Sequence, residues 1–118
     1  MTGGCLCGGV RFALPLPLRD VVVCHCSLCR RSGTLAGAYT AVARDALRLT
    51  ADKTLAWYVD DNDRRRGFCR VCGSTLFWAC EGDPTISVSA GALDGPTGLH
   101  IERHIFTGDA ADWEPVPQ

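Results

Sequence analysis

Residues 67–74 read Gly67-Phe68-Cys69-Arg70-Val71-Cys72-Gly73-Ser74, and this stretch decides how the chain folds. A C-x-x-C pair can wrap one zinc ion through a turn, because the Zn–S bond is about 2.3 Å long and the site is tetrahedral. Gly73 allows the chain to turn back with its amides facing the sulfurs. The stretch therefore predicts half of a metal site built on a tight turn.

Two further cysteine groups stand earlier in the chain, Cys5-Leu6-Cys7 and Cys24-His25-Cys26-Ser27-Leu28-Cys29. Residues i and i+2 of an extended chain share a face, so both sulfurs of a C-x-C pair can reach one ion. The three groups contain seven of the eight cysteines. This clustering predicts metal binding, and disulfides or a redox dithiol are the alternative.

Counting ligands divides the seven cysteines into two sites. A closed structural zinc site needs four protein ligands, and two of the pairs supply them. These four are Cys5, Cys7, Cys69 and Cys72. The remaining three, Cys24, Cys26 and Cys29, then leave one open position on the second ion, which describes a catalytic zinc. Spacing alone also permits the first two groups to share one ion.

Cys80 bears on this division, because it could be the fourth ligand of the second ion and would then close the site. The alternative role is a small buried apolar residue on the strand after the zinc turn. Zinc with three thiolates carries a net charge of −1, so a bound water would be a weak acid. A substrate thiol is therefore the better fourth ligand, since coordination deprotonates thiols outright.

Length and charge narrow the class of protein. The chain has 118 residues, which predicts a single domain over residues 1–118. It has 12 basic and 13 acidic residues and a net charge of −1, so we expect neither a nucleic-acid nor a membrane partner. The start of the chain lacks the basic and apolar segments of a secretory signal, and we expect a reducing, cytoplasmic location.

The rest of the chain is typical of a mainly β protein. Short apolar or β-branched runs alternate with turn residues, and no window shows sustained helical periodicity. A short helical turn is expected at 27–32, ended by Gly33, and a charged hairpin where Arg64–Arg66 adjoin Asp60–Asp63. The expected strands are 9–14, 20–24, 34–43, 47–50, 54–60, 74–79, 85–90 and 100–107.

These motifs, in this order, resemble those of the glutathione-dependent formaldehyde-activating enzyme family, also called the centromere protein V family. The matching stretches span nearly the whole chain. They are Gly4–Phe12, Cys24–Gly33, Gly67–Ser74, Gly91-Ala92-Leu93-Asp94 and His104-Ile105-Phe106, with Trp113 downstream.

The resemblance implies an Mss4-like fold of short antiparallel strands organised around two zinc sites. It assigns the structural zinc to the residues matching Cys5, Cys7, Cys69 and Cys72. It assigns the zinc at the substrate site to those matching Cys24, Cys26 and Cys29. The family reaction adds glutathione to formaldehyde and is classed as a carbon–sulfur lyase reaction in reverse.

These expectations lead to a mechanistic hypothesis. A thiol, glutathione or a similar one, binds the second zinc as thiolate and attacks a small carbonyl compound. Arg30 or Arg31 could pair with substrate carboxylates, because arginine reads a carboxylate through two parallel hydrogen bonds. His25 is a candidate catalytic acid–base group. It lies between two ligands, so in an extended chain it points away from their ion, which favours support of the site or packing over proton transfer. His104 could contribute to the substrate site, although its strand face is expected to be solvated.

Three functions compete on this reading. The first is a zinc-dependent carbon–sulfur lyase, the second a protein that binds or carries a thiol without turnover, and the third a zinc-stabilised interaction module. Three thiolates without a fourth protein ligand favour the first two. A fourth ligand from Cys80 would favour the third.

Overall fold

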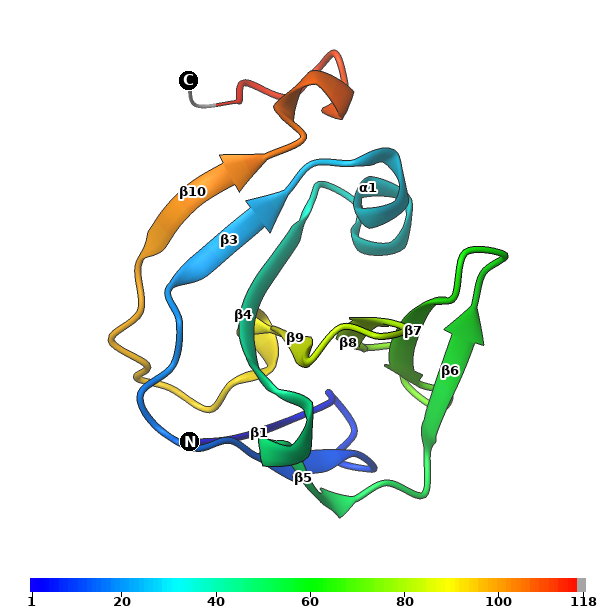
Figure 1. Cartoon of the computed structure of the whole chain (residues 1–118), viewed down its shortest axis with the longest axis vertical. Coiled ribbons are helices and arrows are strands. Elements are labelled where there is room, and N and C mark those ends of the chain that lie inside the picture. Colours follow the sequence, from blue (N-terminus) through cyan, green and yellow to red (C-terminus); the bar gives the residue numbers. More distant parts are fainter. Residues whose placement is uncertain (117–118) are drawn as a thin grey trace.

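The computed structural model describes residues 1–116, and it confirms a mainly β fold. Two sheets and one short α-helix make up most of the chain (Figure 1). The strands are β1 (Thr2–Gly4), β2 (Arg11–Ala13), β3 (Val21–Cys24), β4 (Gly37–Ala43), β5 (Arg48–Ala51), β6 (Leu55–Val59), β7 (Arg64–Cys69), β8 (Thr75–Cys80), β9 (Thr85–Ser89) and β10 (Ile101–Ile105). The helix is α1 (Ser27–Gly33), and three single 3-10 turns cover Arg44–Ala46, Ala90–Ala92 and Thr107–Asp109.

The larger sheet has seven strands in the order β10-β3-β4-β9-β8-β7-β6. Its strands are antiparallel except at one end, where β10 runs parallel to β3. Only antiparallel strands were expected. The difference arises because the chain after β9 travels back along the molecule before β10 begins, so β10 enters the sheet in the same direction as β3 (Figure 1). The smaller sheet has the order β1-β2-β5 and is antiparallel throughout.

Two strands, β1 and β7, were not expected as strands. β1 contains Gly3 and Gly4, which have low β propensity, and β7 begins with three arginines. Tertiary packing explains why glycine occupies position 3 of β1. A Cβ there would lie 2.6 Å from the Phe12 ring and from the Ala92 carbonyl oxygen. The expected hairpin over residues 60–66 is present as the β6–β7 connection.

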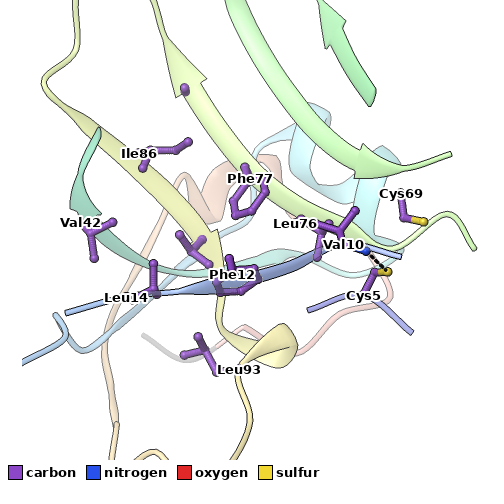
Figure 2. Close-up of a cluster of buried hydrophobic side chains, with 12 residues drawn as sticks. Cys5, Val10, Phe12, Leu14, Val42, Cys69, Leu76, Phe77, Ile86 and Leu93 are labelled. Carbon is purple, nitrogen blue, oxygen red and sulfur yellow. Dashed lines mark hydrogen bonds between the residues drawn. The ribbon is translucent and has the colours of Figure 1, made fainter. Parts of the chain in front are cut away.

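A buried apolar cluster fills the space between the two sheets (Figure 2). Phe12 of β2 and Phe77 of β8 meet edge to face at its centre, with ring centroids 5.4 Å apart. Leu76 and Val88 are fully buried beside them. Each such side chain contributes about 1.5–3 kcal/mol of transfer free energy, so the cluster provides a stable platform for the cysteine turns at its rim.

The helix α1 begins at the cysteine loop, as expected. Cys26 is its N-cap residue, and the Cys26 sulfur accepts a hydrogen bond from the Cys29 amide at 3.4 Å. The helix ends at Gly33, and the positive φ of 75° falls on the next residue, Thr34. No helix in residues 1–116 has both the length and the apolar character needed to cross a membrane.

Replacing Leu76, which is fully buried, with alanine is expected to lower the free energy of unfolding by about 2–5 kcal/mol, because the truncation leaves a cavity between the sheets. Urea denaturation measures this change. Leu35→Ala is the matched control, since Leu35 is 46% exposed and its truncation should change stability by no more than about 0.5 kcal/mol. Equal effects of the two substitutions would show that the cluster does not stabilise the fold.

Candidate metal centre

The first cysteine group joins two segments far apart in the sequence. Cys5 and Cys7 lie in the loop between β1 and β2, and Cys69 and Cys72 flank the turn between β7 and β8. All four sulfurs lie within 4.8 Å of one another. The Cys5–Cys7 and Cys7–Cys69 sulfur distances are 3.6 and 3.7 Å. A tetrahedral site with Zn–S bonds of about 2.3 Å has edges of about 3.8 Å, so these distances fit zinc.

Hydrogen-bond donors surround this first group. The Val10 amide donates to the Cys5 sulfur at 3.2 Å (Figure 2), and the Cys72 amide donates to the Cys69 sulfur at 3.4 Å. A hydrogen bond with the Ser74 side chain lowers the pKa of Cys72 to about 5. A hydrogen bond with the Thr54 side chain likewise lowers the pKa of Cys69. These contacts favour thiolates, the form that binds metal.

The second group comes from one short segment, as expected. Cys24 ends β3, Cys26 caps α1, and Cys29 lies in the first turn of that helix. Their sulfurs lie within 4.8 Å of one another, which is close enough for one ion to bind all three. Cys24 is 9% exposed and Cys29 is 5% exposed. Burial raises the pKa of Cys24 to about 12, so a metal ion must displace a proton from a thiol that holds it tightly.

Cys80 does not join either group within the described residues. It ends β8 and lies opposite Arg64 of β7 in the sheet. Its side chain is partly exposed, so the expected role as a buried apolar residue is not what the structure shows. The three-cysteine group therefore has no fourth cysteine, histidine, aspartate or glutamate ligand among residues 1–116.

A cavity of about 520 Å³ opens onto the three-cysteine group. This volume lies within the range of small-molecule sites, about 300–1,000 Å³. Apolar side chains, including Tyr39, Trp78 and Ile105, pack against the cysteines. Four arginines and one aspartate also line the cavity, namely Arg19, Arg64, Arg66, Arg103 and Asp109.

The four arginines differ in their partners. Arg64 forms an ion pair with Asp60 at 2.8 Å, and Arg19 donates to the Tyr39 carbonyl oxygen at 3.0 Å. Arg66 donates to the Cys29 sulfur at 3.8 Å and to the Ser32 hydroxyl at 3.2 Å. Within residues 1–116, Arg103 has no ion-pair or side-chain hydrogen-bond partner. Arg103 is thus the cavity cation with the greatest freedom to bind an anionic ligand.

Arg30 and Arg31, the arginines expected to bind substrate, do not line this cavity. They lie in the last turn of α1, where Arg31 is exposed and Arg30 is partly buried. Nearness in the sequence suggested these two, but the helix carries them away from the face that bears the sulfurs. The cavity arginines come instead from β7, β10 and the segment before β3.

His25 is buried behind the second group, with 2% of its surface exposed. It does not line the cavity, and its packed position agrees with the expectation that it points away from an ion held by its neighbours. Its Nε2 atom lies 2.9 Å from His104 Nδ1, and its Nδ1 atom lies 3.1 Å from Glu114 Oε1. The Glu114 side chain is itself 7% exposed. Residues of β10 and of the C-terminal segment therefore hold the cysteine loop in place.

The contact between His104 and His25 corrects the expectation that His104 lies on a solvated face of its strand. The β10–β3 pairing shifts register between Ile101 and Arg103, so strict alternation along residues 100–104 does not hold. His104 consequently faces His25, while Arg103 and Ile105 face the cavity. The alternation of side chains along a strand could have indicated that Arg103 and Ile105 share one face. No sequence pattern indicated that Glu114 lies beside His25.

The chain is similar to one family of known proteins and to a solved structure. The family described as glutathione-dependent formaldehyde-activating enzyme matches residues 1–109. A crystal structure of a Rhodobacter sphaeroides protein is similar in fold, with a TM-score of 0.73 and 25% sequence identity. The similarity covers 88% of this chain and 99% of that one.

Serine substitutions should separate the two cysteine groups. We expect Cys69→Ser to lose the metal of the first group and to unfold the chain at ordinary temperature, because that group ties the N-terminal loop to β7. Cys26→Ser should lose one metal ion per chain and keep the fold. Elemental analysis and circular dichroism measure both effects, and Cys80→Ser is the control that should keep the full metal content. An unchanged metal content in Cys26→Ser would contradict the second group.

Removing the Glu114 side chain should weaken the support of the cysteine loop. Glu114→Ala leaves the buried His25 Nδ1 atom without its neighbour, so we expect a loss of about 1–3 kcal/mol in the free energy of unfolding. Chemical denaturation measures the change. Glu102→Ala on the exposed side of β10 is the control and should have little effect. A Glu114→Ala protein as stable as the parent would exclude this supporting role.

Proposed function

This chain belongs to the glutathione-dependent formaldehyde-activating enzyme family, and we propose that it joins the thiol of glutathione, or of a similar small thiol, to formaldehyde or a similar carbonyl compound. In this proposal it is a zinc-dependent carbon–sulfur lyase. The observation that carries the proposal is the position of Cys24, Cys26 and Cys29 at a cavity of about 520 Å³, without a fourth ligand from residues 1–116.

We assign one zinc ion to each cysteine group. The four sulfurs of the first group suit a closed, structural ion, and their spacing supports that assignment. The three sulfurs of the second group suit an ion with one position open to the cavity. Zinc bound there supplies a site at which a thiol loses its proton at neutral pH.

Charge in the cavity supports an anionic thiol as the ligand. Glutathione carries two carboxylates and one ammonium group besides its thiol. Arg103 and Arg19 line the cavity and suit the carboxylates, and Asp109 suits the ammonium group. Arg64 contributes less, because Asp60 already neutralises it. In this proposal the charged side chains of the cavity orient glutathione, so that the glutathione thiol reaches the three-cysteine group.

The reaction needs a bond between sulfur and carbon and a proton on oxygen. The thiol sulfur gives its electron pair to the carbonyl carbon, the carbon–oxygen π bond breaks, and the oxygen gains the negative charge. The proton that leaves the thiol finally resides on this oxygen, so the product is a hydroxymethyl thioether when the carbonyl compound is formaldehyde. The chain's own contribution is to hold both reactants in contact and to exclude competing water.

We assign Tyr39 as the group that gives a proton to the oxygen, and the proton released by the thiol then restores the neutral phenol, so that no net proton is gained or lost. Tyr39 packs against Cys24 and Cys29 and lines the cavity. Burial raises the pKa of Tyr39 to about 12, so the phenol stays protonated throughout the neutral range and presents an O–H group. Trp78 and Ile105 form apolar walls around it. This arrangement supports Tyr39 as the donor.

Calorimetry with the zinc-loaded chain tests ligand binding. We expect glutathione to bind, and Arg103→Gln to bind it about tenfold or more weakly, because a charge-assisted hydrogen bond to a carboxylate is lost. Arg48→Gln is the control, since Arg48 lies on β5 of the other sheet and outside the cavity. Equal affinity of the parent and Arg103→Gln would remove Arg103 from the site.

Exchange spectroscopy tests turnover. The chain should accelerate the interconversion of free glutathione and formaldehyde with their adduct. Tyr39→Phe should slow this interconversion about 100-fold or more, while the metal content is unchanged. Binding of glutathione without any acceleration would instead identify a thiol carrier. Full activity of Tyr39→Phe would show that another group donates the proton.

A further inference from the structure

The two ends of the seven-stranded sheet are protected very differently. β10 forms one end and β6 the other, on opposite sides of the molecule in Figure 1. β10 carries charged side chains at Glu102 and Arg103 and has a register shift against β3. Charges and bulges of this kind prevent an edge strand from pairing with another chain. β10 is therefore a protected edge.

β6 has none of these protections. It reads Leu55-Ala56-Trp57-Tyr58-Val59, without a charge, a proline or a glycine. Its pairing with β7 is regular over all five residues. Trp57, Tyr58 and Val59 are 42%, 61% and 48% exposed. A regularly paired, uncharged and exposed edge strand is a surface that favours strand addition.

The hydrogen bonds that flank β6 show which of its backbone groups face outward. Arg70 donates its amide to the Thr54 carbonyl oxygen at 2.8 Å, and Asp60 donates its amide to the Arg64 carbonyl oxygen at 3.0 Å. Residues of an antiparallel strand alternate between facing their partner and facing away from it. Ala56 and Tyr58 therefore bond to β7, and the backbone groups of Trp57 and Val59 are left at the edge.

The side chains on one face of β6 continue the apolar core. Leu55 packs against the buried cluster, and Trp57 stacks on Phe77 with centroids 6.0 Å apart. Val59 lies on the same face as these two, because side chains alternate along a strand. An occupant that extends the sheet here would cover Trp57 and Val59 and enlarge the core.

We propose that two copies of this chain associate by antiparallel pairing of β6 with β6, on a two-fold axis at Trp57. In this register Trp57 lies opposite Trp57 of the second copy, and Leu55 lies opposite Val59. The residues whose backbone groups face outward are thus the ones that meet. The Val59 amide of each copy donates to the Leu55 carbonyl oxygen of the other.

Charge complementarity selects both the second copy as occupant and this register. Lys53 precedes β6 and Asp61 follows it, and both are exposed. Within residues 1–116 neither forms an ion pair in its own chain. Both residues lie in the turns at the ends of β6, and pairing about Trp57 brings the turn with Lys53 of each copy beside the turn with Asp61 of the other. A shift by two residues in one direction would instead oppose Asp52 and Asp60. A shift in the other direction would oppose Lys53 and Asp63 but would set the apolar Leu55 opposite the charged Asp61.

Sedimentation velocity on the zinc-loaded full chain over a range of concentrations tests the proposal. We expect a dimer in equilibrium with a monomer. Val59→Pro removes the outward amide without removing a bond to β7, and it should weaken dimerisation about tenfold or more. Val59→Thr keeps the amide and is the matched control. A monomer at all concentrations, or a dimer unaffected by Val59→Pro, would overturn the proposal.

A charge exchange tests the register and does not depend on proline. Lys53→Asp and Asp61→Lys should each weaken dimerisation about threefold or more, because each places like charges beside one another. The double variant Lys53→Asp/Asp61→Lys should restore the parent affinity. Raised salt should weaken the parent dimer in the same direction. Single variants without effect, or a double variant as weak as either single one, would overturn pairing about Trp57.

Discussion

The contact between the first cysteine pair and the β7–β8 turn is the constraint on which the rest of the structure depends. The Cys7 and Cys69 sulfurs are 62 positions apart in the sequence and 3.7 Å apart in space. This approach seats the three-stranded sheet on the seven-stranded one and encloses Phe12 against Phe77. It also sets the position of β7, and therefore of the arginines that β7 extends into the cavity.

The second cysteine group has the same donor atoms in different surroundings. The first group lies at the rim of the core, where Ser74 and Thr54 favour thiolates. The second lies at the end of a buried strand, held from behind by His25 and Glu114 and open in front to the cavity. Two sites of similar chemistry thus differ in access. An ion at the first group would be enclosed by four sulfurs, whereas an ion at the second would face the cavity.

Much of the fold was predictable because local signals agree with it. The strands of β3, β4, β8 and β9 have apolar or β-branched runs, and α1 begins at a capping cysteine and ends at a glycine. β7 was missed as a strand because its three arginines carry no alternating pattern, and β1 because glycine is a poor strand former. Their pairing comes from neighbours that lie far away in the sequence. The parallel entry of β10 likewise depends on the path of the chain after β9, which no local pattern encodes.

The sequence by itself determined the grouping of seven cysteines, because the spacing of ligands follows from the geometry of a tetrahedral ion. It favoured a division into four and three, and the structure brings together the sulfurs of Cys5, Cys7, Cys69 and Cys72 and those of the other three. The sequence also indicated that His25 points away from the cysteines beside it. Only the tertiary structure decided that Cys80 stays apart from both groups, that Arg103 and Arg66 rather than Arg30 and Arg31 line the cavity, and that Glu114 lies beside His25. The reason is physical: a side chain's local neighbours set its chemistry, but its partners across the fold depend on register and on the packing of distant strands.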